Sequence, residues 1–171
     1  MKTKMMMLCL TLISWGAFAQ HDHAGMHDKK NTDKEKISEN MVMFKDAKLE
    51  TAYKNYIVLK DALVSSNKDE AKNAAIQLQK SMEGVADGKM VADEAGKLAS
   101  AGSLDEQRKA FSDVSSMMAM LLKGGKLSMG MIYVEYCPMA KASWLSNEKE
   151  IKNPYYGDQM LNCGSVKEMI H

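Results

Sequence analysis

The chain has 171 residues, with 23 Lys and Arg against 22 Asp and Glu and a formal net charge of +1. This even balance argues against nucleic acid as the main partner. The 2 Pro and 11 Gly exclude collagen-like and proline-rich disordered classes. Methionine is unusually frequent with 17 residues, whereas there are only 3 Cys and 4 His. The functional argument therefore depends on where these sulfur and imidazole side chains lie.

The N-terminus has the order of an export signal. Two lysines precede an apolar run over residues 5–15, and a small-residue cleavage site ends at Ala19. The run is too short to span a bilayer as a mature helix. We therefore expect residues 1–19 to be a signal peptide that is cleaved after Ala19. The mature protein is then exported to the periplasm and does not associate with the membrane.

Residues 20–38 form a polar segment that contains three of the four histidines. Such a composition cannot bury enough apolar surface to fold, so we expect a flexible tail. Imidazole suits Cu(II), Zn and Ni, and a secondary metal site is one interpretation of the segment. The other is a solvated tail with incidental histidines. The candidate ligands of the tail are His21, His23, Met26 and His27.

Residues 39–171 are expected to form a single helical domain. The helical pattern begins near Glu39, and apolar residues recur every three or four positions over residues 49–63, 71–85 and 107–121. Asn67 with Glu70, and Ser103 with Glu106, have the spacing of capping boxes. A shorter helix is expected over residues 91–99. This pattern predicts a small helical bundle.

The pattern changes after Gly124 and Gly125. Residues 131–136 are rich in β-branched and aromatic side chains, which predicts a short strand. Beyond it we expect irregular loops, with one helical turn over residues 158–163. The predicted fold class is therefore mostly α, a small helical bundle followed by a short strand and a compact, loop-rich C-terminal cap.

Both cysteines of the mature chain lie in this cap, and each has a methionine nearby. Met139 follows Cys137 by two residues, the same-face spacing of an extended segment. Met160 precedes Cys163 by three residues, the same-face spacing of a helical turn. If the two pairs converge, they form a site of two thiolates and two thioethers. Such a donor set selects Cu(I) and, less exclusively, Ag(I).

The same two cysteines allow a different interpretation. Two cysteines in an exported domain often form a disulfide, and a Cys137–Cys163 bridge would leave no metal site. The two states can also be redox alternatives, because thiolates bind metal and a disulfide does not.

A second group of methionines has two interpretations. It is either a Cu(I) path or filler of irregular gaps in the core, and core filling is favoured for the two that lie on the apolar stripe of residues 107–121. The group consists of Met117, Met118, Met120, Met129 and Met131.

Several segments resemble a known family. The C-terminal ones are Tyr-Val-Glu-Tyr-Cys-Pro-Met-Ala over residues 133–140, Trp-Leu-Ser over 144–146 and the stretch 151–164; helical segments 56–63 and 107–112 are similar as well. The family is a domain of uncharacterised function in exported bacterial proteins, also found fused to periplasmic adaptor subunits of heavy-metal (copper/silver) efflux pumps. The resemblance extends over about residues 45–170. It implies a metal-handling role for a mostly helical domain, with Cys137, Met139, Met160 and Cys163 as ligands.

An enzymatic activity is not expected. Residues 28–170 contain no histidine that could act as a base, and the chain has no Gly-rich phosphate loop. Neither cysteine has a base beside it in the sequence. The sequence therefore predicts an exported soft-metal-binding protein that buffers or delivers Cu(I), with a periplasmic efflux-pump component as its protein partner. The alternative is a disulfide-stabilised helical interaction module without metal.

Overall fold

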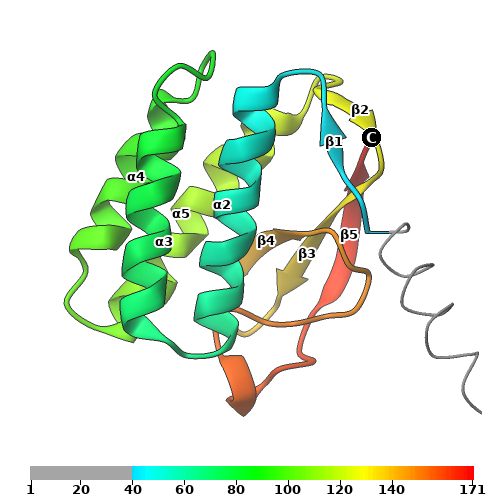
Figure 1. Cartoon of the computed structure of the whole chain (residues 1–171). Coiled ribbons are helices and arrows are strands. Elements are labelled where there is room, and N and C mark those ends of the chain that lie inside the picture. Colours follow the sequence, from blue (N-terminus) through cyan, green and yellow to red (C-terminus); the bar gives the residue numbers. More distant parts are fainter. Residues whose placement is uncertain (1–39) are drawn as a thin grey trace, which may run out of the picture.

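A computed structural model describes residues 40–171. The predicted signal peptide, its cleavage site after Ala19, and the tail with His21, His23, Met26 and His27 lie outside the described residues. Among residues 40–171, about 50% are helical and 17% are in strands. The chain therefore combines a layer of helices with a sheet, as Figure 1 shows.

Within residues 40–171, four helices form one side of the molecule (Figure 1). Each helix packs against the next one along the chain, which agrees with the predicted bundle. None of these four helices has the length and apolar character that crossing a membrane would require. The helices are α2 (Ala47–Val64), α3 (Lys68–Ser81), α4 (Lys89–Ser100) and α5 (Leu104–Leu122).

The N-cap bond of each of the two predicted capping boxes is confirmed. The Asn67 side chain accepts a hydrogen bond from the Glu70 N–H at 3.1 Å, and Ser103 Oγ accepts one from the Glu106 N–H at 3.2 Å. The Glu106 carboxylate also accepts from the Gly102 N–H at 2.7 Å. These bonds satisfy backbone donors that a helix leaves free at its first turn, and so they fix where α3 and α5 begin.

The chain before α2 is extended, so the expected start of the helical pattern near Glu39 is wrong. Strand β1 (Met43–Phe44) pairs antiparallel with β2 (Leu127–Met129), which follows α5. Helix α2 begins only after Asp46, whose carboxylate accepts from the Lys48 N–H at 2.8 Å. Strands this short give no alternation that could be read from the sequence.

The C-terminal region contains a sheet where we expected mainly loops. In the described part of the chain this sheet has three antiparallel strands, with β3 (Ile132–Cys137) between β4 (Ala142–Ser146) and β5 (Ser165–Ile170). Strand β3 is the predicted strand, displaced by one residue. The mostly-α expectation therefore holds for the helical layer and not for the C-terminal part.

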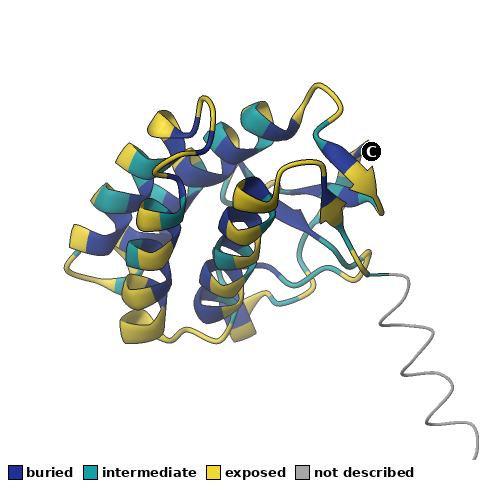
Figure 2. Cartoon of the chain, turned by 45° about the horizontal axis from the view of Figure 1, so that its top comes forward, coloured by how far each residue is buried: buried dark blue, intermediate teal, exposed yellow. Residues whose placement is uncertain are grey.

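One hydrophobic core joins the helices to the sheet. The Tyr56 ring of α2 stacks on Phe111 of α5, with ring centroids 5.5 Å apart. Phe111 in turn contacts Tyr155, which packs edge-on against Trp144 of β4. Figure 2 shows the buried faces of the helices turned inward and their exposed faces turned outward. The aromatic chain fixes the position of the sheet against α2 and α5.

Candidate metal site

The two cysteines of residues 40–171 lie next to each other. Cys137 ends β3 and Cys163 lies just before β5, and these strands pair antiparallel with Tyr136 opposite Ser165. The end of one strand therefore meets the start of the other. Burial raises the pKa of Cys163, and the neighbouring Cys137 thiol raises it further through hydrogen bonding and charge. Both cysteines are free, and we call them the sulfur pair.

The two members of the sulfur pair differ in exposure. Cys137 is fully buried, and its Sγ accepts a hydrogen bond from the Ala140 N–H at 3.4 Å. Cys163 is partly exposed, and its carbonyl accepts from Asn153 Nδ2 at 2.8 Å. The buried Asn153 also donates its backbone N–H to the Leu161 carbonyl at 2.8 Å. Asn153 therefore ties the loop that follows β4 to the segment that carries Cys163.

Met139 lies in the turn between β3 and β4 and not on the strand. Because β3 ends at Cys137, the extended spacing from which we expected a shared face does not apply. The Met139 side chain is 60% exposed, whereas Cys137 is completely buried. The thioether is therefore at the surface of the turn that covers the buried thiol.

Met160 follows the short helix η1 (Gly157–Gln159), which replaces the longer helical turn expected over residues 158–163. Its carbonyl accepts a hydrogen bond from the Cys163 N–H at 3.0 Å, so the two residues span a single turn. The Met160 side chain is 39% exposed. Both methionines of the predicted site thus lie at the surface, on the two segments that carry the sulfur pair.

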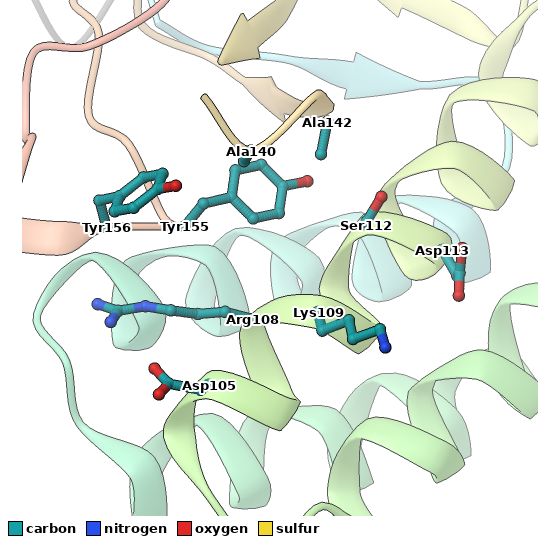
Figure 3. A pocket seen from close by; sticks show the side chains of 9 residues that line it. All are labelled: Asp105, Arg108, Lys109, Ser112, Asp113, Ala140, Ala142, Tyr155 and Tyr156. Carbon is teal, nitrogen blue, oxygen red and sulfur yellow. The ribbon is translucent and has the colours of Figure 1, made fainter. Parts of the chain in front are cut away.

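A pocket of about 430 Å³ opens beside the turn that carries Met139 (Figure 3). Ala140 of the turn and Ala142, the first residue of β4, form one wall, and Tyr155 lies beside them. The Tyr155 hydroxyl donates to the Ser143 carbonyl at 2.5 Å, and the nearby Cys137 is one of the groups that raise its pKa, after burial and Tyr56. The pocket therefore lies directly outside the wall that covers Cys137.

The opposite wall of this pocket belongs to α5 and includes Arg108. Its Nε donates to the Pro154 carbonyl at 3.1 Å, and its Nη2 donates to the Leu63 carbonyl at 3.2 Å and to Ser66 Oγ at 2.9 Å. Burial lowers the pKa of Arg108, and Asp105 partly offsets this effect. Arg108 thus ties the end of α2 to the loop that precedes η1.

Sequence reasoning missed a buried carboxylate close to the sulfur pair. Glu135 is completely buried, and neither carboxylate oxygen makes a hydrogen bond within residues 40–171. Burial raises the pKa of Glu135 to about 8, although Lys60 and the Trp144 indole N–H, which falls short of a standard hydrogen bond, act in the opposite direction. The available signal was a charged residue in the middle of an otherwise apolar strand.

Lys60 is the other buried charge on this side of the core. It interrupts the apolar stripe of α2 and is only 4% exposed. Its Nζ lies 2.8 Å from the exposed Asp61 carboxylate. The side chain therefore buries its stem and brings its charge to a surface partner.

The described residues offer sulfur donors rather than a conventional metal cluster. No group of three or more His, Cys, Asp or Glu side chains between residues 40 and 171 is arranged to hold a metal ion. The predicted set instead has two kinds of donor. Two of its members are the neighbouring thiols of the sulfur pair, and the other two are the thioethers of Met139 and Met160 at the surface. Such a set would present soft donors from two segments that the sheet holds together.

A family model described as "Protein of unknown function (DUF3347)" matches residues 52–130. The match includes most of α2 and continues through β2, and it ends before β3. It supports a resemblance to an uncharacterised family over the helical layer, a shorter range than the 45–170 we expected, and it does not include the sulfur pair. The family description names no activity, export signal or efflux-pump fusion. No curated protein and no solved structure matches the chain.

Proposed function

We propose that this protein binds Cu(I) through Cys137 and Cys163 and buffers or delivers the ion in copper homeostasis or efflux. The observation that supports this most is the contact between two free thiols, one buried and one partly exposed. Paired thiolates favour Cu(I) over harder ions. Binding would displace the thiol protons, so the ion is cargo that is exchanged for protons.

Met139 and Met160 complete the proposed donor set. Both side chains are exposed and lie on the segments that carry the two cysteines, so they can approach the sulfur pair without disturbing the core. Thioethers are neutral and soft, and they suit Cu(I) and Ag(I). An ion held partly by surface methionines could be passed to another protein without unfolding the sheet.

The wider role is part of the same proposal. Residues 1–19 would direct export to the periplasm, with cleavage after Ala19. The tail ligands His21, His23, Met26 and His27 would form a secondary site. The protein would act without catalysis, and a periplasmic efflux-pump component would receive the ion, with no role for nucleic acid or for membrane association.

The contact between the thiols also supports one alternative, a disulfide-stabilised interaction module without metal. Thiol titration of protein isolated from the periplasm under anaerobic conditions distinguishes the two. Cu(I) binding predicts two titratable thiols for each mature chain after the metal is removed with a chelator. The alternative predicts none until a reductant is added.

Competition against a chromogenic Cu(I) chelator tests the proposed site. We expect Cys137→Ser and Cys163→Ser each to weaken Cu(I) binding by about 100-fold or more, because a neutral hydroxyl replaces a thiolate. The double variant Met139→Leu, Met160→Leu should weaken it by about tenfold, and its stability should change by less than about 1.5 kcal/mol because Leu nearly conserves the volume of Met.

Met129→Leu is the matched control, because Met129 is 59% exposed and lies on β2, outside the site. Its Cu(I) affinity should equal that of the wild type. Unchanged affinity in both cysteine variants would reject the proposal. Unchanged affinity in the methionine double variant alone would leave a site of two cysteines and reject the thioether ligands.

A further inference from the structure

Among the described residues, three methionines line one pocket of about 220 Å³ at the end of α5. Met117 and Met120 come from α5, and Met90 comes from the first turn of α4. This pocket is separate from the sulfur pair, because the pocket beside Cys137 is lined by residues 105–113 of the same helix. The two pockets therefore lie along different parts of α5.

The helix arrangement brings these three thioethers together. Helices α4 and α5 are consecutive and packed, so the beginning of α4 and the end of α5 lie at the same end of the helical layer (Figure 1). Met117 and Met120 are three residues apart and are therefore neighbours on one helix face. Met90 lies on the adjacent helix and lines the same pocket.

Core packing does not account for two of the three side chains. Met90 is 55% exposed and Met120 is 53% exposed, and Met117 is partly buried against the core. Met118 lies between Met117 and Met120 in the sequence, and it is completely buried. Filling of the core thus accounts for Met118, whereas Met90 and Met120 present their thioethers to the pocket and to solvent.

We propose that Met90, Met117 and Met120 form a second soft-metal site, one that takes Cu(I) or Ag(I) without any thiolate. Thioether sulfur prefers such monovalent ions over Zn or Ca. The charges around the pocket are compatible with a cation. Lys123 is already paired with Glu168 at 2.9 Å, and the remaining lysine of the lining, Lys126, is balanced by the Asp87 carboxylate, which also lines the pocket.

The site makes no use of Cys137 or Cys163, so this inference does not depend on the function proposed above. Three neutral donors displace no protons when they bind. The affinity of the methionine site should therefore change little with pH, in contrast to a thiolate site. The pH dependence of metal affinity therefore distinguishes the methionine site from the thiolate site.

The test uses the full-length chain with Cys9, Cys137 and Cys163 replaced by Ser and with ¹³C-labelled methionine methyl groups. Ag(I) nitrate is titrated while the methyl resonances are recorded. We expect the methyls of Met90, Met117 and Met120 to shift together along one binding curve. The methyls of Met118 and Met129 should stay unchanged, and Zn(II) should shift none of the three.

A triple variant and a matched control complete the experiment. Met90→Leu, Met117→Leu, Met120→Leu should remove one bound Ag(I) and keep the melting temperature close to that of its parent. The control triple Met41→Leu, Met43→Leu, Met129→Leu replaces exposed methionines elsewhere and should bind Ag(I) as its parent does. Equal shifts at all exposed methionines, or equal Ag(I) binding by the pocket variant and its parent, would overturn the proposal.

Discussion

The phenol oxygen of Tyr56 accepts a hydrogen bond from the backbone N–H of Leu145 at 2.9 Å. The same hydroxyl lies 2.8 Å from Ser115 Oγ, so one buried side chain of α2 contacts both β4 and α5. Burial raises the pKa of Tyr56 far above its usual value, so the hydroxyl keeps its proton and has it available for Ser115. These two bonds form a buried polar connection between the helical layer and the sheet.

Replacing Tyr56 by Phe tests this connection. The variant leaves the buried Leu145 N–H without its partner, and we expect a loss of about 2 kcal/mol in the free energy of unfolding. Urea denaturation measures the change. In the Tyr56→Phe background, Ser115→Ala should cost less than it does in the wild type, because their shared bond is already gone. Independent, additive losses would contradict the proposed bond.

A second prediction concerns Arg108, which donates to Pro154, Leu63 and Ser66 at once. The planar guanidinium group of arginine is a fork of several N–H donors. Lysine carries one ammonium group and cannot reproduce this fork. We expect Arg108→Lys to lower the free energy of unfolding by about 2–3 kcal/mol, because buried carbonyls lose their donors. The adjacent Lys109 is exposed, so Lys109→Arg should change stability by less than about 0.5 kcal/mol. Equal effects of the two substitutions would contradict the role of the fork.

The helices were predictable because their signals are local. Apolar spacing and the Asn67 and Ser103 caps identify α3 and α5 without reference to the rest of the chain. Strands β4 and β5 were missed for opposite reasons, since β4 is buried along nearly its whole length and β5 is exposed at most positions. Neither one shows the alternation that marks a half-buried strand.

The candidate site was only partly predictable. The contact between Cys137 and Cys163 depends on the pairing of β3 with β5, yet both interpretations of the sequence required the cysteines to be close. The position of Met139 could not be derived, because it depends on where β3 ends. The burial of Glu135 also depends on packing from several elements, which no local spacing encodes.

A third prediction concerns the pH dependence of stability. Burial raises the folded-state pKa of Glu135 from 4.5 to about 8, so the folded protein holds this proton more tightly than the unfolded chain does. Stability is therefore highest below about pH 4.5 as far as this group is concerned, and it falls as the pH rises toward 8. Lys60 and Lys152 oppose the shift, while Glu148 increases it. The full effect is at most about 5 kcal/mol.

Glu135→Gln separates this group from all others that titrate. Gln resembles the protonated side chain, so the variant should match the wild type at pH 4 and become the more stable of the two by pH 9. Chemical denaturation at several pH values measures the difference between the two proteins. A difference that does not change with pH would show that Glu135 is not protonated in the folded state.

The fourth prediction concerns Gly164, which directly follows Cys163. A Cβ atom at this position would lie 2.8 Å from Trp144 Cη2 and 3.2 Å from the Tyr136 carbonyl oxygen. We expect Gly164→Ala to destabilise the fold by about 1–3 kcal/mol, because the fully buried Trp144 has little room to move. On the function proposed above, the variant should also bind Cu(I) more weakly. Thermal unfolding and Cu(I) competition measure the two effects.

Gly124→Ala is the control for backbone strain alone. Gly124 has a φ of +108° and no atom within 4 Å of an added Cβ, so any cost reflects conformation only, about 1–2 kcal/mol. Its Cu(I) affinity should be unaffected. If Gly164→Ala keeps wild-type stability and Cu(I) affinity, the close packing of Trp144 against the loop does not position Cys163.

The pairing of β1 with β2 also constrains the order in which the chain folds. Phe44 lies opposite Leu127, so this short ladder closes a loop that contains all the residues of α2 to α5. Contacts between successive helices join nearby segments, so we expect them to form before the β1–β2 ladder, because closing a long loop carries a larger entropy cost. The sulfur pair is completed only when β5, the last strand, pairs with β3. During synthesis, a chain that has not yet reached residue 165 can build its helices but cannot assemble the Cys137–Cys163 contact.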